Sequence, residues 1–194
     1  MTGIIILAAG SSSRLGKPKQ NIVYQDKTLL QKTIETALAV AGNPVIVVLG
    51  ANSHVIKPTI EHLPITIVYN EDWQQGMASS IRSGLNELRN TSPDKSAVLL
   101  MLCDQPFADI ELINLLITNH QENGITASAY NDTTRPPAIF DKYYFDELLK
   151  LKGSEGAKKL LLKYADTVNT IPFPLGSIDI DTLKDVDELN KKAL

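Results

Sequence analysis

The chain has 194 residues, of which 43% are hydrophobic and 21% charged, and its formal net charge is −3 at pH 7. This length accommodates one domain with a substantial core, and the small negative charge excludes the global basic field that holds nucleic acid. The single cysteine, Cys103, excludes an intramolecular disulfide and ends an apolar run, where we expect it to be a buried packing residue. Because no run reaches the roughly 20 apolar residues of a membrane-spanning helix, we expect a cytoplasmic protein without nucleic-acid or membrane partners.

The chain opens with a short apolar run, residues 4–7, that predicts a buried strand. The run stops at the small residues 8–10, and a loop rich in Gly and Ser follows, with Arg14, Lys17 and Lys19 close behind. A strand that feeds such a loop places backbone N–H groups around an anion, and nearby cations neutralise it. The loop is neither a Walker A motif nor a dinucleotide fingerprint. We expect it to bind a nucleoside triphosphate; an ordinary strand-to-helix turn is the alternative, but it does not account for the cations.

Apolar patterning then alternates between helix and strand up to residue 119. Residues at helical spacing predict helices over 29–40, 53–61, 77–88 and 110–117, with Pro58 interrupting or kinking the second. Continuous apolar runs, typical of parallel strands covered on both faces, predict strands over 45–49, 65–69 and 97–103. The alternation predicts an α/β fold with a doubly wound, mostly parallel sheet.

The second half of the chain alternates less regularly. We expect strands over 126–130 and 137–140, helices over 143–149 and 156–164, extended segments over 167–172 and 177–180, and a closing helix over 183–192. Neither a repeat nor a linker divides the chain. We therefore expect one domain over residues 1–194, with a nucleotide-binding part over about 1–106 and an acceptor-binding part over about 107–194.

Polar residues gather at the carboxyl ends of the expected strands, where open α/β sheets bind their ligands. Asn70 follows the third strand and leads to the segment 76–80, and Asp104 follows the fourth. A charge directly after an apolar run is costly unless it pairs with a cation or a metal. Since Mg²⁺ prefers one or two carboxylates together with substrate phosphates, we expect Asp104 to bind a metal; a helix N-cap is the alternative, for which Asp109 is better placed.

A second pair of carboxylates occurs near the end of the chain, in Asp179-Ile180-Asp181-Thr182. Alternation places Asp179 and Asp181 on the same side of an extended segment. The pair either completes the metal shell around Asp104 or caps the final helix.

Four ordered motifs link these features. Residues 7–19 read Leu-Ala-Ala-Gly-x-x-x-Arg-Leu-Gly-x-Pro-Lys, 76–85 read Gly-Met-x-x-Ser-x-x-x-Gly-Leu, 153–161 read Gly-Ser-x-Gly-Ala-Lys-x-Leu-Leu, and 179–182 read Asp-Ile-Asp-Thr. From end to end, the chain resembles the molybdenum cofactor cytidylyltransferase family. The resemblance implies a three-layer, Rossmann-like nucleotidyltransferase fold of the GT-A type. It also implies transfer of CMP from CTP to molybdenum-molybdopterin, release of pyrophosphate, Mg²⁺ as cofactor, and a molybdoenzyme or its chaperone as recipient.

The resemblance also implies roles for particular residues. Arg14 and the loop N–H groups hold the β- and γ-phosphates, Lys19 neutralises the α-phosphate, and Arg14, Lys19 and Asp104 are the catalytic residues. Asp104 and Asp181 bind the metal, with Asp179 as second choice. The expected nucleotide-binding residues are Leu7, Ala8, Ala9, Gly10, Ser11, Arg14, Lys19, Asn70, Gly76, Ser79 and Ser80.

In the 76–85 motif the functional and the structural interpretation both stay open. Either Gly76 lets the backbone approach the base and Ser79 or Ser80 hydrogen-bonds near the nucleoside, or a serine-capped helix begins here and packs by its apolar residues.

Two residues bear on the choice of substrate. Guanylyl-transferring relatives have Leu-Ala-Gly-Gly in the loop, and the methyl group of Ala9 would narrow the base pocket toward a pyrimidine. Arg135 stands where the family usually has Gly, and it either binds a phosphate on the acceptor or is a solvated loop cation. Three further functions stay open: a guanylyltransferase for the same cofactor, a transferase for a sugar or polyol phosphate, and a non-catalytic or redox relative that binds nucleotide. Such a relative would be expected to lack Lys19, Asp104 or Asp181.

Overall fold

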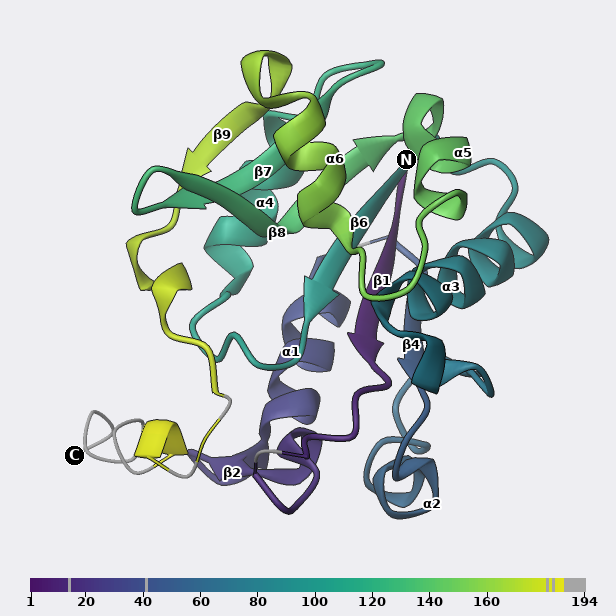
Figure 1. The fold of residues 1–194 in the computed structure, drawn as a ribbon, viewed down its shortest axis with the longest axis vertical. Helices are drawn as coiled ribbons and strands as arrows, with labels where there is room; N and C mark the ends of the chain where they lie inside the picture. The colour runs from purple at the N-terminus through teal and green to yellow at the C-terminus, as the bar shows by residue number, and fades with distance from the viewer. Residues whose placement is uncertain (14, 41, 181, 183, 187–194) are drawn as a thin grey trace.

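The computed structural model describes residues 1–13, 15–40, 42–180, 182 and 184–186 of the chain. These residues form a seven-stranded sheet in the order β5-β4-β1-β6-β8-β7-β9 (Figure 1). Its strands are β1 (Thr2–Ala8), β4 (Val45–Leu49), β5 (Thr66–Tyr69), β6 (Ala97–Leu102), β7 (Ile125–Tyr130), β8 (Thr133–Asp141) and β9 (Asn169–Pro172). β8 pairs antiparallel with both of its neighbours, and the other pairings within this sheet are parallel. The expected α/β fold with a mostly parallel sheet is confirmed.

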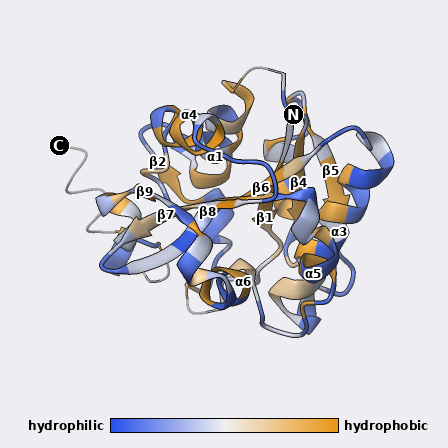
Figure 2. Cartoon of the chain, turned by 90° about the horizontal axis from the view of Figure 1, so that it is seen from above, coloured by the Kyte–Doolittle hydropathy of each residue, from blue (hydrophilic) through white to orange (hydrophobic). Residues whose placement is uncertain are grey.

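Helices cover both faces of the sheet (Figure 2). They are α1 (Leu29–Leu38), α2 (Ser53–Ile56), α3 (Met77–Thr91), α4 (Ile110–Thr118), α5 (Phe145–Leu149) and α6 (Ala157–Lys163). Alternate residues of β1 pack to opposite sides: Ile4 and Ile6 face the layer of α1 and α4, whereas Ile5 and Leu7 face the layer of α3, α5 and α6. The result is a three-layer core that buries the apolar runs on both faces. Within the described residues, none of these helices has the length and apolarity to cross a membrane.

A small hairpin, β2 (Val23–Tyr24) and β3 (Lys27–Thr28), lies between the first loop and α1. Beside it is a third apolar cluster, separate from the two that cover the sheet, formed by Leu15, Ile22, Tyr24, Leu29 and Ile180. This cluster joins the residues that follow β1 to the segment after β9, so distant parts of the chain meet at the carboxyl edge of the sheet.

Several expected elements differ in the structure. The helix expected over 53–61 is the single turn α2 followed by a 3-10 turn, Lys57–Thr59, because Pro58 lacks an N–H group and interrupts the helix. The strand expected over 137–140 is the longer β8, which includes Pro136 and Pro137. The extended segment expected over 177–180 begins inside a 3-10 turn, Pro174–Ser177. Most of the closing helix expected over 183–192 lies outside the described residues.

Candidate active site

The loop after β1 is held by a buried side chain. Gln20 is fully buried, and its amide donates to the carbonyl oxygens of Ala8 and Gly10 at 2.8 and 3.0 Å. In the part of the chain that the structure describes, the backbone N–H groups of residues 10–13 have no protein acceptor. N–H groups gathered in one turn bind anions, so this geometry supports the predicted phosphate site.

The loop also packs directly against Gly50, the residue that follows β4. A Cβ atom added at Gly50 would lie 2.6 Å from Cβ of Trp73 and 2.9 Å from both Cβ and the carbonyl oxygen of Ala9. The N–H of Ala51 donates to that same carbonyl at 3.0 Å. Only a glycine at position 50 therefore lets both the loop and Trp73 pack this closely against it.

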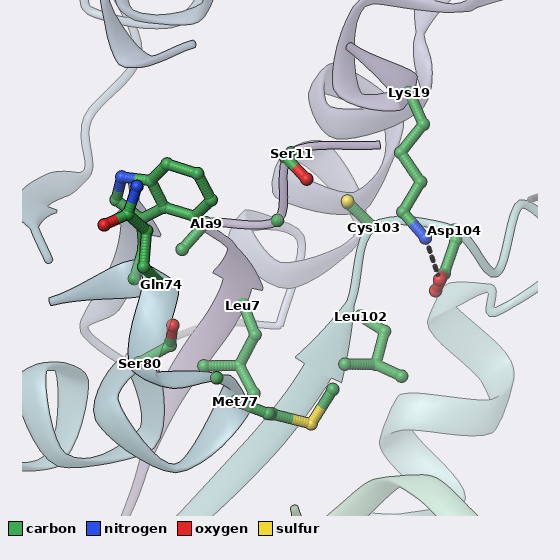
Figure 3. Close-up of a pocket in the computed structure, with 13 residues that line it drawn as sticks. Leu7, Ala9, Ser11, Lys19, Gln74, Met77, Ser80, Leu102, Cys103 and Asp104 are labelled. Atoms are coloured by element: carbon green, nitrogen blue, oxygen red, sulfur yellow. Dashed lines mark hydrogen bonds and ion pairs between the residues drawn. The ribbon is translucent and has the colours of Figure 1, made fainter. Parts of the chain in front are cut away.

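A cavity of about 300 Å³ opens at the carboxyl edge of the sheet, beside this loop (Figure 3). Of the residues expected from the sequence, Leu7, Ala9, Gly10, Ser11, Lys19, Gly76, Ser80 and Asp104 line it, together with Trp73, Gln74, Met77, Leu102 and Cys103. Figure 3 shows Leu7, Met77 and Leu102 close together, apart from the charged pair of Lys19 and Asp104. The cavity thus combines an apolar part with a charged end.

The charged end is an ion pair between residues far apart in the sequence. Nζ of Lys19, from the 3-10 turn Lys19–Asn21, lies 2.5 Å from Oδ2 of Asp104, directly after β6, and the two side chains are only 18% and 16% exposed. Asp109, not Asp104, caps α4 by accepting the N–H of Leu112 at 2.9 Å. The N-cap alternative for Asp104 is therefore wrong, and its carboxylate is available to the pocket.

Asp104 also fits a divalent cation. Its second carboxylate oxygen, Oδ1, is buried and has no hydrogen-bond partner among the described residues. A buried oxygen of this kind raises the free energy of the folded protein unless a ligand or an ion binds to it. The described residues contain no group of three or more His, Cys, Asp or Glu side chains placed around one metal position. The predicted partner Asp181 and the predicted phosphate ligand Arg14 lie outside the described residues.

The second-choice ligand, Asp179, lies near Arg135. Its Oδ2 is 3.9 Å from a guanidinium nitrogen of that arginine. The next residue, Ile180, donates its N–H to the carbonyl oxygen of Asp104 at 3.0 Å. The segment carrying Asp179 thus runs alongside Asp104, on the side of β8.

Cys103 lines the pocket, but its thiol is a poor nucleophile at neutral pH. Burial, and then the neighbouring Asp104 carboxylate, raise the pKa of the Cys103 thiol to about 12. The thiol is protonated at neutral pH, and only the thiolate is a strong nucleophile. The packing role predicted for this buried residue agrees with that protonation state.

Asn70 and Ser79 lie behind the pocket wall. The Asn70 amide donates to the hydroxyl oxygens of Ser79 and Ser80 at 2.8 and 3.0 Å, and the Ser79 hydroxyl donates to the carbonyl of Gly76 at 2.8 Å. Ser80 lines the cavity, whereas Asn70 and Ser79 are buried and do not. Ala8 is also absent from the lining and packs into the core. These three residues lie behind the cavity lining, and the nucleotide contacts expected of them stay predictions.

Gly76 is required for a reason that the sequence did not indicate. It has φ 101°, and an added Cβ would lie 2.4 Å from the carbonyl oxygen of Gly153. The same carbonyl accepts the N–H of Ala78 at 3.2 Å, in the first turn of α3. Gly76 therefore allows the loop before α6 to pack against the start of α3, in addition to lining the cavity.

Sequence reasoning missed Gln20 and Gly50, and among the lining residues it missed Trp73, Gln74, Met77, Leu102 and Cys103. Gln20 is a polar residue between Lys19 and Asn21, and nothing in that context indicates burial. Trp73 lies three residues before the motif of residues 76–85, and an aromatic residue close to its glycine was the available signal for a pocket wall.

A three-layer α/β fold, a Gly- and Ser-rich turn after the first strand and a lysine–carboxylate pair in the adjoining cavity fit the nucleotidyltransferase class. The chain belongs to the family of the MobA-like NTP transferase domain, whose family model matches residues 4–168. This membership confirms the family that the four sequence motifs indicated.

Individual relatives carry different names. Nicotine blue oxidoreductase of Paenarthrobacter nicotinovorans is 34% identical over 140 residues, which are 72% of this chain and 66% of that protein. Molybdenum cofactor cytidylyltransferase of Escherichia coli is 30% identical over 81 residues, 42% of either chain. Rv0371c of Mycobacterium tuberculosis H37Rv superposes with a TM-score of 0.86 at 29% identity, covering 98% of this chain and 97% of that one. Its complex with manganese superposes with a TM-score of 0.81 at 26% identity, over 98% and 97% of the two chains.

Proposed function

We propose that the protein transfers CMP from CTP to the phosphate of molybdenum-molybdopterin and releases pyrophosphate. One observation carries the proposal: the 2.5 Å pair of Lys19 and Asp104 and the Gly- and Ser-rich loop line the same cavity. Nucleotidyl transfer depends on positioning and on neutralising phosphate charge, which this combination supplies. The family and the sequence motifs support the molybdenum cofactor as acceptor. Residues 1–106 would hold the nucleotide and residues 107–194 the acceptor.

The chemical step needs little beyond placement. A phosphate oxygen of the acceptor attacks the α-phosphorus of CTP, and the bond from that phosphorus to the oxygen bridging the β-phosphorus breaks, so pyrophosphate leaves with the bonding electrons. The loop N–H groups and Arg14 hold the β- and γ-phosphates, and Lys19 neutralises the α-phosphate as charge builds there. A phosphate monoester is largely ionised near neutral pH, so no general base is required.

Mg²⁺ is the cofactor in this proposal. Two observations support it. Oδ1 of Asp104 is buried and has no hydrogen-bond partner among the described residues, and the similar protein Rv0371c has a structure in complex with manganese. Asp104 would hold the ion, with Asp181 as the second ligand by family resemblance. A bound divalent cation supplies positive charge that stabilises the phosphate oxygens in the transition state.

The base of the nucleotide would lie beside Ala9, Trp73 and Ser80, which line the cavity together. Gly50 holds the loop of Ala9 against Trp73, so the methyl group of Ala9 occupies space that a glycine would leave open. A pyrimidine needs less of that space than a guanine does. This supports CTP over GTP as donor.

The test is pyrophosphate release with each of the four ribonucleoside triphosphates, with and without molybdenum-molybdopterin. We expect the highest rate with CTP plus the acceptor, about tenfold or more above GTP, because a pocket that discriminates by one small group gives factors of this size. A rate with GTP far above that with CTP would contradict the cytidylyl assignment. Turnover with a sugar phosphate in place of molybdenum-molybdopterin would contradict the assignment of molybdenum-molybdopterin as the acceptor.

A redox function is the second candidate, favoured by the name of one relative, nicotine blue oxidoreductase. The loop and the Lys19–Asp104 pair are explained by phosphate chemistry and have no evident part in electron transfer. A change in the absorbance of nicotine blue when a reduced nicotinamide cofactor is added as electron donor, without any nucleoside triphosphate, would favour the redox function.

A further inference from the structure

A second polar cluster lies across Asp104 from the phosphate-binding loop. Asp104 follows β6, whose neighbours in the sheet are β1, which feeds the loop, and β8. Because β8 runs antiparallel to β6, its first residues lie at the carboxyl edge of the parallel strands. Arg135 is among these first residues, and it pairs across the sheet with Ser128 of β7. The sheet order thus places a cation on the side of Asp104 away from the nucleotide loop.

Arg135 sits between an aromatic ring and a carboxylate. Its guanidinium carbon is 5.7 Å from the ring centroid of Tyr130, and its terminal nitrogen is 3.9 Å from Oδ2 of Asp179. A separation of 3.9 Å is too long for a hydrogen bond. The Arg135 side chain is 39% exposed, so part of its planar set of five donors is accessible to a ligand.

Two hydrogen-bond donors in this cluster are buried without an acceptor among the described residues. They are Nε of Arg135 and the hydroxyl oxygen of Tyr130, and the two side chains lie close enough for Arg135 to oppose part of the rise in the Tyr130 pKa. Burial, and then the Asp179 carboxylate, raise the pKa of Tyr130, so its hydroxyl stays protonated at neutral pH. Burying an N–H and an O–H donor without acceptors raises the free energy of the folded protein. An oxyanion placed between them supplies the acceptors that both donors lack.

We propose that Arg135 and Tyr130 form an anion subsite that holds the phosphate of the acceptor on the β8 side of Asp104. The proposal rests on the proposed nucleotidyl transfer and adds how the second substrate is recognised. Arginine suits this task because its planar donors bind two phosphate oxygens at once. A solvated loop cation would have neither the ring beneath it nor buried donors beside it.

The first test is steady-state kinetics with the molybdenum-molybdopterin concentration varied at saturating CTP. We expect Arg135→Gln to raise the KM for the acceptor about tenfold or more, as loss of a charge-assisted hydrogen bond does, and to leave the KM for CTP unchanged. Arg135→Lys should recover part of the loss, and Tyr130→Phe should raise the acceptor KM by a smaller factor. Lys142→Gln is the matched control, since Lys142 is an exposed cation directly after the opposite end of β8. An unchanged acceptor KM in Arg135→Gln, or equal rises for both substrates, would overturn the subsite.

A second measurement does not require turnover. Equilibrium dialysis of radiolabelled inorganic phosphate, with a non-hydrolysable CTP analogue filling the nucleotide site, should show one bound phosphate in the wild type and in Lys142→Gln. Binding should weaken about tenfold or more in Arg135→Gln. Phosphate binding that is absent from the wild type or unaffected by Arg135→Gln would overturn the subsite. If no triphosphate gave pyrophosphate release, the proposed function would be overturned. The dialysis result would then test the anion subsite by itself.

Discussion

In the proposed reaction, Lys19 is the residue whose position bears most directly on the chemical step. In the free protein its ammonium group occupies one oxygen of Asp104, the same carboxylate that is proposed to hold a divalent cation. Both side chains are largely buried, so the pair is shielded from solvent and each charge depends on its partner. In the proposed mechanism this carboxylate would therefore serve two cations: Lys19, which it pairs with in the structure, and a divalent cation that it would hold when the nucleotide is bound.

Lys19→Gln is expected to lower kcat by roughly 10²–10³-fold, because the variant loses a positive donor aimed at the developing phosphate charge. The same change should strengthen Mn²⁺ binding in the absence of nucleotide, since the lysine no longer competes for Oδ2 of Asp104. Pyrophosphate release measures the first effect, and electron paramagnetic resonance of free Mn²⁺ measures the second.

Lys27→Gln is the matched control for this variant. Lys27 is also ion-paired, 2.6 Å from Glu35, but both side chains are about half exposed and neither lines the cavity that contains Lys19. We expect wild-type kcat and Mn²⁺ affinity for this control. Wild-type kcat in Lys19→Gln itself would refute the catalytic role of the lysine.

Sequence reasoning found the charged members of the site and missed the residues that hold them. Lys19 and Asp104 were predictable because a cation beside a Gly- and Ser-rich loop, or a carboxylate directly after an apolar strand, requires a charged partner or ligand. Gln20 was not, because its burial depends on the two loop carbonyls that only the folded chain brings to it. The expected nucleotide contacts of Asn70 and Ser79 stay predictions, and their hydrogen bonds to each other give these residues a structural reason to be present.

At the scale of elements, the start of α3 depends on one glycine. Gly76 combines a φ of 101° with a gap of only 2.4 Å between an added Cβ and the carbonyl of Gly153. Gly76→Ala must therefore strain its own backbone and push away the loop before α6. We expect the free energy of unfolding to fall by about 2 kcal/mol or more, measured by urea denaturation with the fluorescence of Trp73, the single tryptophan of the chain.

Gly10→Ala is the control, because Gly10 is another glycine that lines the same cavity. An added Cβ at Gly10 meets no atom within 4 Å. Its free energy of unfolding should stay within about 0.5 kcal/mol of the wild type, as for most exposed substitutions. Equal destabilisation by the two variants would mean that the contact with Gly153 is not what requires glycine at position 76.

The elements themselves were predictable where a continuous apolar run or a clear helical spacing existed. The parallel strands β1, β4 and β6 are of this kind, and the expected ranges agree with them closely. β8 was foreseen only in its second half, because Pro136 and Pro137 lack the N–H groups that a sheet uses. That first half carries Arg135, so the weakest part of the strand prediction coincides with the proposed acceptor subsite.

At the scale of the whole molecule, the third apolar cluster brings the residues that follow β1 into contact with the segment after β9. Ile180, from the segment after β9, is fully buried against Leu15, Ile22 and Leu29, which belong to the N-terminal part. Its backbone N–H also bonds to the carbonyl of Asp104. The geometry of the proposed metal-binding carboxylate therefore depends on a contact between segments that lie far apart in the sequence.

Ile180→Ala and Ile113→Ala provide a matched pair for testing this coupling. Both isoleucines are fully buried, but Ile113 lies on α4, within the cluster that covers one face of the sheet. Each substitution should lower the free energy of unfolding by about 2–4 kcal/mol, because it removes the same buried methyl and methylene groups. Only Ile180→Ala should also weaken Mn²⁺ and CTP binding, since it loosens the segment that is hydrogen-bonded to Asp104. Isothermal titration of both variants, at a temperature where both are folded, decides the question: equal affinities would show that the cluster contributes stability alone, whereas a loss confined to Ile180→Ala requires that the segment after β9 positions Asp104.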